Sequence, residues 1–146
     1  MYRPQLGLLT AIAALVLACE DSTGPAAPNY SGTWVADSIY CRDSFDTGSQ
    51  ILPLGASLTV VLNADSTIGG RLFIPAAWMP DGMPAENDTL VGSWQGTATG
   101  FHVYGPWGTL LYNVSFAVTA DTARATLLVK NFPLQLFGYG FRLHRQ

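Results

Sequence analysis

The chain is poor in the residues that most often build catalytic and metal sites. Two cysteines and two histidines occur in 146 residues, and His102 and His144 are too far apart for a metal-ligand pattern. A nucleophile elbow of the form Gly-x-Ser-x-Gly is missing, and no glycine-rich phosphate loop precedes a helical pattern. We therefore predict no catalytic residues, no metal, no cofactor and no enzymatic activity.

Charged side chains are also scarce. They make up 12% of the residues and leave a net charge of −3. Because nucleic-acid binding requires a cluster of basic side chains, this composition argues against nucleic acid as a partner. Glycine, proline and aromatic residues are plentiful by comparison, which favours β structure with many turns.

No apolar run is long enough to cross a bilayer as a helix. The N-terminal run, residues 6–18, holds about 13 residues, whereas a membrane-spanning helix needs roughly 20. A short head that carries Arg3 precedes this run, and small residues gather toward its end. A basic head, a short apolar stretch and a small residue before a cleavage point are typical of a secretory signal peptide, which we predict over residues 1–18.

Four residues at the end of this run resemble the lipobox of bacterial lipoproteins: Val16, Leu17, Ala18 and Cys19. The resemblance implies that the Cys19 thiol receives a diacylglycerol, that the chain is cut before it, and that the new amine is usually acylated. More than one acyl chain is what stable membrane anchoring requires. The alternative is an ordinary signal peptide in which Cys19 has no such role.

A polar segment rich in small residues follows the cysteine. Residues 19–29 are therefore expected to form a lipidated cysteine and a flexible tether, because this composition cannot bury apolar surface. The predicted location is the bacterial cell envelope, with the membrane as a partner through Cys19. Glu20 and Asp21 come next, and they leave the choice between inner and outer membrane open.

Cys41 is the one cysteine left in the mature chain if Cys19 is lipidated. An internal disulfide is then impossible, so stability must come from packing. Three interpretations of Cys41 remain open: a buried apolar residue, a reactive thiol beside Arg42, and an intermolecular bridge.

Alternation of apolar and polar residues dominates the rest of the sequence. It predicts about eight strands, at residues 32–40, 58–62, 68–74, 91–99, 101–104, 112–119, 125–130 and 137–144. Eight short antiparallel strands can close a small barrel, so we predict an all-β, up-and-down barrel over residues 30–146. A β-sandwich is the alternative architecture.

Two loops interrupt this pattern, at residues 41–55 and 75–88. The second loop carries three prolines and the large apolar residues Trp78, Met79 and Met83. A loop of this length is uncommon unless it is functional or disordered. It is expected to cover a barrel mouth, to contact a membrane or protein partner, or to pack Trp78 back onto the barrel.

The first predicted strand carries the pattern Tyr30-x-Gly32-x-Trp34, which resembles the Gly-x-Trp motif that opens lipocalin barrels. The resemblance implies that Trp34 plugs the closed end of the barrel. It also implies a late-strand arginine packed across that tryptophan, for which Arg142 is the matching residue. The Thr-Asp motif of that family has no counterpart here.

A lipocalin-like barrel implies capture of a small apolar molecule in its interior. The expected ligand-binding residues are the inward aromatic side chains, with His102 as a hydrogen-bond donor: Phe116, Phe137, Tyr139, Phe141 and His102. The alternative function is a non-enzymatic interaction or structural module of the cell envelope, with a filled barrel and a protein partner at residues 75–88.

Overall fold

The computed structural model describes residues 28–42, 48–79, 82–106, 109–131 and 135–146. The expected signal peptide, Cys19 and all but the last two residues of the expected tether lie outside these described residues. Within the described residues the helical elements are two short 3-10 turns. Neither turn has the length or the apolar character that crossing a bilayer as a helix requires.

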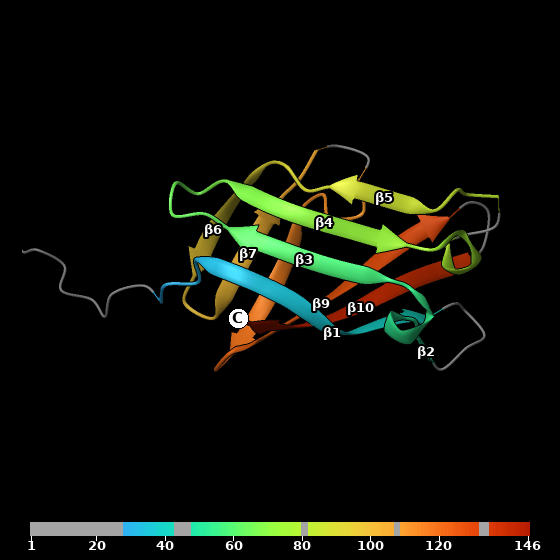
Figure 1. Cartoon of the computed structure of the whole chain (residues 1–146), viewed down its shortest axis with the longest axis horizontal. Coiled ribbons are helices and arrows are strands. Elements are labelled where there is room, and N and C mark those ends of the chain that lie inside the picture. The colour runs from blue at the N-terminus through green and yellow to red at the C-terminus, as the bar shows by residue number, and fades with distance from the viewer. Residues whose placement is uncertain (1–27, 43–47, 80–81, 107–108, 132–134) are drawn as a thin grey trace, which may run out of the picture.

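The described chain is built almost entirely of antiparallel strands (Figure 1). The two 3-10 helices are η1 (Leu52–Leu54) and η2 (Ala76–Trp78). The strands are β1 (Gly32–Arg42), β2 (Ser49–Gln50), β3 (Ser57–Leu62), β4 (Ile68–Ile74), β5 (Glu86–Thr89), β6 (Ser93–Thr97), β7 (Gly100–Tyr104), β8 (Val114–Thr119), β9 (Thr122–Asn131) and β10 (Gln135–Arg145).

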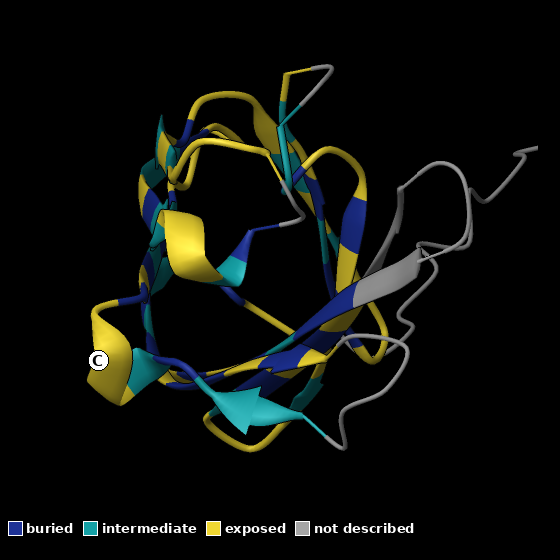
Figure 2. Cartoon of the chain, turned by 90° about the vertical axis from the view of Figure 1, so that its right-hand side faces the viewer, coloured by how far each residue is buried: buried dark blue, intermediate teal, exposed yellow. Residues whose placement is uncertain are grey.

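The strands form one sheet in the order β5-β4-β3-β1-β10-β9-β8-β7-β6, and this sheet curls into a ring (Figure 2). Backbone hydrogen bonds join its two ends. The Ile68 N–H donates to the Gly92 carbonyl oxygen at 3.1 Å, and the Trp94 N–H donates to the Ser66 carbonyl oxygen at 2.9 Å. β5 and β6 therefore follow one another along the same edge of β4, and the predicted antiparallel up-and-down barrel is confirmed.

The inner wall of the barrel is apolar because alternate residues of each strand face inward. Ala36, Ile39 and Cys41 of β1 are buried opposite Leu143, Phe141 and Tyr139 of β10. A β-bulge between Ala36 and Ser38 shifts the alternation of β1 by one residue, so that both ends of this long strand turn apolar side chains inward.

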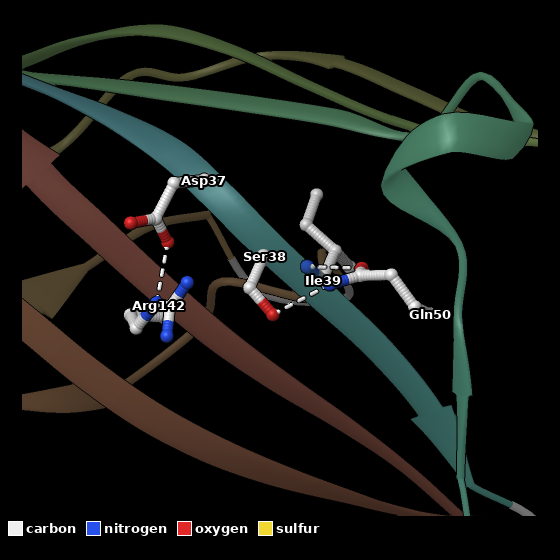
Figure 3. Close-up of polar contacts among 5 residues, drawn as sticks. All are labelled: Asp37, Ser38, Ile39, Gln50 and Arg142. Atoms are coloured by element: carbon white, nitrogen blue, oxygen red, sulfur yellow. Dashed lines mark hydrogen bonds and ion pairs between the residues drawn. The ribbon is translucent and has the colours of Figure 1, made fainter.

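Next to the bulge, β2 pairs with β1 at Tyr40 and Cys41, and its Gln50 side chain reaches back to Ser38 and Ile39 (Figure 3). Gln50 donates from Nε2 to the Ser38 hydroxyl at 2.8 Å and accepts from the Ile39 N–H at 2.9 Å. Ser38 is consequently buried without an unsatisfied hydroxyl, and the Gln50 amide oxygen satisfies the Ile39 N–H on the edge of β1 that faces β2.

The loop expected over residues 75–88 contains structure that the sequence pattern does not indicate. Its last residues belong to β5, which pairs with β4 from Arg71↔Thr89 to Ile74↔Glu86. The four residues of β5 are all polar, and Asp and Asn are depleted in strands. Their extended conformation comes from pairing with the edge of β4, so the prediction of a loop is wrong for residues 86–88.

Candidate ligand-binding site

An aromatic cluster packs the end of the barrel where β1 begins. Trp34 is almost completely buried, and its indole N–H donates to the Tyr30 carbonyl oxygen at 2.9 Å. The Phe101 ring lies 5.4 Å from Trp34 and stacks on Phe116 at 5.0 Å. Aromatic pairs at these distances add to the energy of burial, so this end is a firmly packed floor.

The glycine of the Gly-x-Trp pattern has a backbone role at this floor. Gly32 has a φ of 131°, and Gly92 of the second Gly-x-Trp sequence has a φ of 138°. A Cβ atom on Gly92 would lie 2.0 Å from the Tyr104 carbonyl oxygen. Positive φ and close backbone approach both require glycine, which explains why each tryptophan-bearing strand starts with one.

The arginine over Trp34 is Arg145, and the expectation for Arg142 is wrong. Trp34 and Arg145 are cross-strand partners, and the Arg145 guanidinium lies 5.9 Å from the Trp34 ring. Arg142 is on the outer face, where its Nε donates to Asp37 at 2.7 Å. Successive residues of β10 point to opposite faces of the sheet, and Arg142 and Arg145 are an odd number of residues apart. The two arginines therefore lie on opposite faces.

Arg145 also ties the chain before β1 to the barrel. Its guanidinium donates to the carbonyl oxygen of Asn29 at 3.2 Å and to that of Ser31. We expect Arg145→Ala to lower the free energy of unfolding by about 1 kcal/mol through loss of these contacts. Arg142→Ala is the matched control, and it should leave the unfolding midpoint nearly unchanged because its ion pair is exposed. Equal effects in urea titrations would contradict this assignment.

The predicted aromatic residues lie on the inner wall as far as they are described. Phe116 and Phe141 are each 2% exposed, and Tyr139 is completely buried. Phe137 belongs to β10 with its backbone opposite Val129, but its side chain lies outside the described residues. Their contact with a ligand stays a prediction.

His102 does not face the interior, so its expected role as a ligand donor there is wrong. It alternates with the buried residues Phe101 and Val103 and therefore points outward. On the outer wall its Nδ1 is 2.6 Å from the Ser115 hydroxyl oxygen, and its Nε2 is hydrogen-bonded to Asn113 Oδ1. The imidazole thus links β7 to β8 from outside the barrel.

At the end opposite the aromatic floor, the segment after β4 lies across the barrel (Figure 2). The Tyr139 hydroxyl donates to the Trp78 carbonyl oxygen at 2.6 Å and lies 3.4 Å from the Met79 sulfur. Cys41 Sγ is 3.6 Å from the same carbonyl oxygen. Trp78 packs against the core, as one expectation for this loop has it, and the segment also covers this barrel mouth, whereas contact with a partner stays a prediction. Cys41 is a buried thiol.

Two carboxyl groups, Glu86 and Asp88, also face the interior near this end. In the register of β5 with β4, Glu86 lies opposite Ile74 and Asp88 lies opposite Leu72, and both aliphatic partners are fully buried. Directly opposed residues of neighbouring strands point to the same side of the sheet, so both carboxyls are on the inner wall. Asp88 Oδ2 is buried and makes no hydrogen bond.

The carboxyl pair is electrostatically strained. Burial, together with the neighbouring Asp88 carboxyl, raises the pKa of Glu86 to about 7, against the opposing effect of a hydrogen bond from the Leu110 backbone. Burial also raises the pKa of the Tyr139 hydroxyl, and the Cys41 and Glu86 charges raise it further. The interior therefore concentrates negative charge at one end of an otherwise apolar wall.

This pair escaped the sequence analysis because Glu86 and Asp88 read as part of a polar loop. The one available signal was their spacing of two, which places both on one face of any strand. Two carboxyls are too few for a dedicated metal site, and within the described residues no group of three or more His, Cys, Asp and Glu gathers to hold an ion.

Comparison with models of known protein families and with curated proteins found no match to this chain. The fold belongs to the class of antiparallel, lipocalin-like up-and-down barrels. Fold alone does not define an activity, so function is argued from the interior of this barrel.

Proposed function

We propose that this protein is a lipid-anchored binding protein of the bacterial cell envelope that holds a small, mainly apolar molecule inside its barrel. The observation that carries the proposal is the composition of the inner wall. Buried aliphatic and aromatic side chains line it, and a few polar groups gather at one end. Small-molecule sites in proteins are mostly apolar with a few placed polar groups, and closed small barrels accommodate one such ligand.

The two ends of the barrel are closed in different ways, which supports ligand entry at one of them. The aromatic floor of Trp34, Phe101 and Phe116 blocks one end. The other end is covered by the Trp78–Met79 segment, which consists of a single 3-10 turn held by Tyr139 and Cys41. We expect the covered end, rather than the aromatic floor, to be the end that opens.

The anchor belongs to the proposal because of the lipobox resemblance at Cys19. The described chain begins at residue 28, beside the aromatic floor and at the opposite end from the Trp78–Met79 segment (Figure 1). A chain of about ten residues spans at most roughly 35 Å. An acylated Cys19 would thus attach the barrel to the membrane at its floor end and keep this end within roughly 35 Å of the membrane surface.

Native mass spectrometry of the whole protein, purified from its own membrane, tests both parts of the proposal. We expect a mature chain that starts at Cys19 and carries acyl groups, and a second mass that leaves the folded protein on denaturation. An unmodified N-terminus would contradict the anchor. A bare protein that also takes up no added C8 or C16 amphiphile would contradict the binding function.

A second candidate is a non-enzymatic envelope module with a filled barrel and a partner at its covered end. Two exposed apolar side chains favour it, Leu54 of η1 at 54% and Met83 of the loop between η2 and β5 at 42%. Exposed apolar side chains of this kind are candidate contacts for a protein partner. If the same mass spectra show the protein without a bound ligand, this second function becomes the favoured one.

A further inference from the structure

The interior carboxyl pair has no counter-charge in the described part of the molecule. Within these residues the one ion pair joins Arg142 to Asp37 on the outer face. The Arg71 guanidinium, on the strand next to β5, also points outward and donates to Asn87 Oδ1 at 2.8 and 3.1 Å. Burying carboxyls without a cationic partner destabilises a fold, so a ligand is the missing partner to consider.

We propose that Glu86 and Asp88 bind the ammonium head group of an amphipathic amine whose apolar part lies along the inner wall of the barrel. This inference rests on the proposed function, because it assigns a chemical class to the ligand of the same interior. Asp88 Oδ2, buried and without a hydrogen-bond partner, is an acceptor that a protonated amine would satisfy.

The position of the pair along the barrel fits a ligand with one charged end. Glu86 is opposite Ile74 at the end of β4, and Asp88 is one inward position nearer the aromatic floor. Beyond Asp88 the inner wall continues with buried apolar residues of β3 and β4. An ammonium between the two carboxyls would therefore direct its alkyl part toward Leu72 and Trp34, and the fully buried side chains on this path would have to move apart to admit it.

Electrostatics favours a cation over a neutral or anionic head group. Among the described side chains, the titratable groups that face this end from elsewhere in the barrel wall are Tyr139 of β10 and Cys41 of β1, and neither supplies a positive charge at neutral pH. Attraction between opposite charges is several-fold stronger in a partly buried site than in bulk water. An anionic head group would lie beside two carboxylates, and the same electrostatic interaction would then be repulsive.

The rival explanation is structural. A proton retained on Glu86 and donated to the Asp88 carboxylate, with or without a water molecule at Asp88 Oδ2, would satisfy the pair without any ligand. The two explanations differ in one measurable respect. Only a cation-binding pair makes affinity depend on the sign of the head-group charge at constant chain length.

The test compares octylammonium, octanol and octanoate by isothermal titration calorimetry. The protein is the mature chain with Cys19→Ser, produced without residues 1–18, so that neither the acylation site nor the apolar signal segment remains and no detergent is needed. At pH 8 we expect octylammonium to bind about tenfold more tightly than octanol, with octanoate the weakest of the three. Lowering the pH to 6 should weaken octylammonium alone, because protonation of Glu86 removes one of the two charges.

Substitutions of Glu86 and Asp88 test whether these two carboxyls cause the preference for octylammonium. Asp88→Asn and Glu86→Gln keep side-chain size, and each should reduce octylammonium affinity about tenfold while leaving octanol unchanged. Asp121→Asn makes the same charge change in the exposed β8–β9 turn and should alter neither affinity. Titrations at pH 6 in two buffers of different ionisation heat should show proton release on octylammonium binding, because Glu86 still carries most of its proton at that pH. A purely structural pair would show no such release.

Each outcome decides the inference. Tenfold preference for octylammonium that is lost in both variants supports it. Equal binding of octanol and octylammonium overturns it while leaving the proposed binding function intact. If none of the three probes binds, the inference and the proposed function are both contradicted. Thermal unfolding of each variant confirms that the folded protein is being measured.

Discussion

Replacing Trp34 with alanine is expected to lower the free energy of unfolding by about 3 to 5 kcal/mol, the usual range for a buried tryptophan. The side chain is 1% exposed and is the largest fully buried group of the described core. Its removal would also break the hydrogen bond to Tyr30 and the ring contact with Phe101. Guanidinium denaturation followed by circular dichroism measures the loss.

The second Gly-x-Trp sequence provides a control within the same chain. Trp94 is half-buried, and its indole N–H donates to the Asn63 carbonyl oxygen at 2.8 Å. Because less of its surface leaves water on folding, Trp94→Ala should lower the free energy of unfolding by about 1 to 2 kcal/mol. Equal losses in the two variants would show that Trp34 is not the centre of a packed floor.

The second large effect is a loss of stability as the pH rises through the acid range. The pKa of Glu86 is about 7 in the folded protein, raised from an ordinary value of 4.5. The folded state therefore binds more protons than the unfolded state between these values, and stability must fall as the pH increases from about 4.5 to about 7. After allowance for partial exposure of this carboxyl, the expected fall is about 1 to 2 kcal/mol.

Glu86→Gln isolates this effect because glutamine does not titrate. The variant should lose the fall in stability over this window and should exceed the original protein by about 1 to 2 kcal/mol at pH 8. Asp88→Asn should shift the window to lower pH, since the Asp88 carboxyl helps to raise the pKa of Glu86. Urea denaturation at half-unit pH steps measures the pH range over which the stability falls. A Glu86→Gln curve that parallels the original one would contradict an electrostatically strained pair.

The strands of the apolar wall were predictable because local alternation carries the information. Residues 68–74 were predicted as a strand and form β4 with the same bounds, and residues 137–144 lie within β10. Alternation also predicted that Tyr139, Phe141 and Leu143 share one face. Burial of apolar surface then leaves a single choice of which face points inward.

The arginine above Trp34 was predicted less well, although the information was present. The alternation of β10 places Arg142 on the face opposite Phe141, which excludes it from the interior. Resemblance to the lipocalin pattern favoured Arg142, whereas the two-residue period favours Arg145. The physical periodicity was the better guide, because side chains reach Trp34 only from the inner face.

By itself the sequence determined that this chain is all-β, where its apolar strands lie, and which residues of each strand share a face. The tertiary structure decided that Glu86 and Asp88 belong to a strand and point into the barrel. The physical reason is that apolar side chains choose the interior by leaving water, whereas the polar residues of β5 have no such local preference. Their conformation and direction come from backbone hydrogen bonds to β4, a partner that no local pattern specifies.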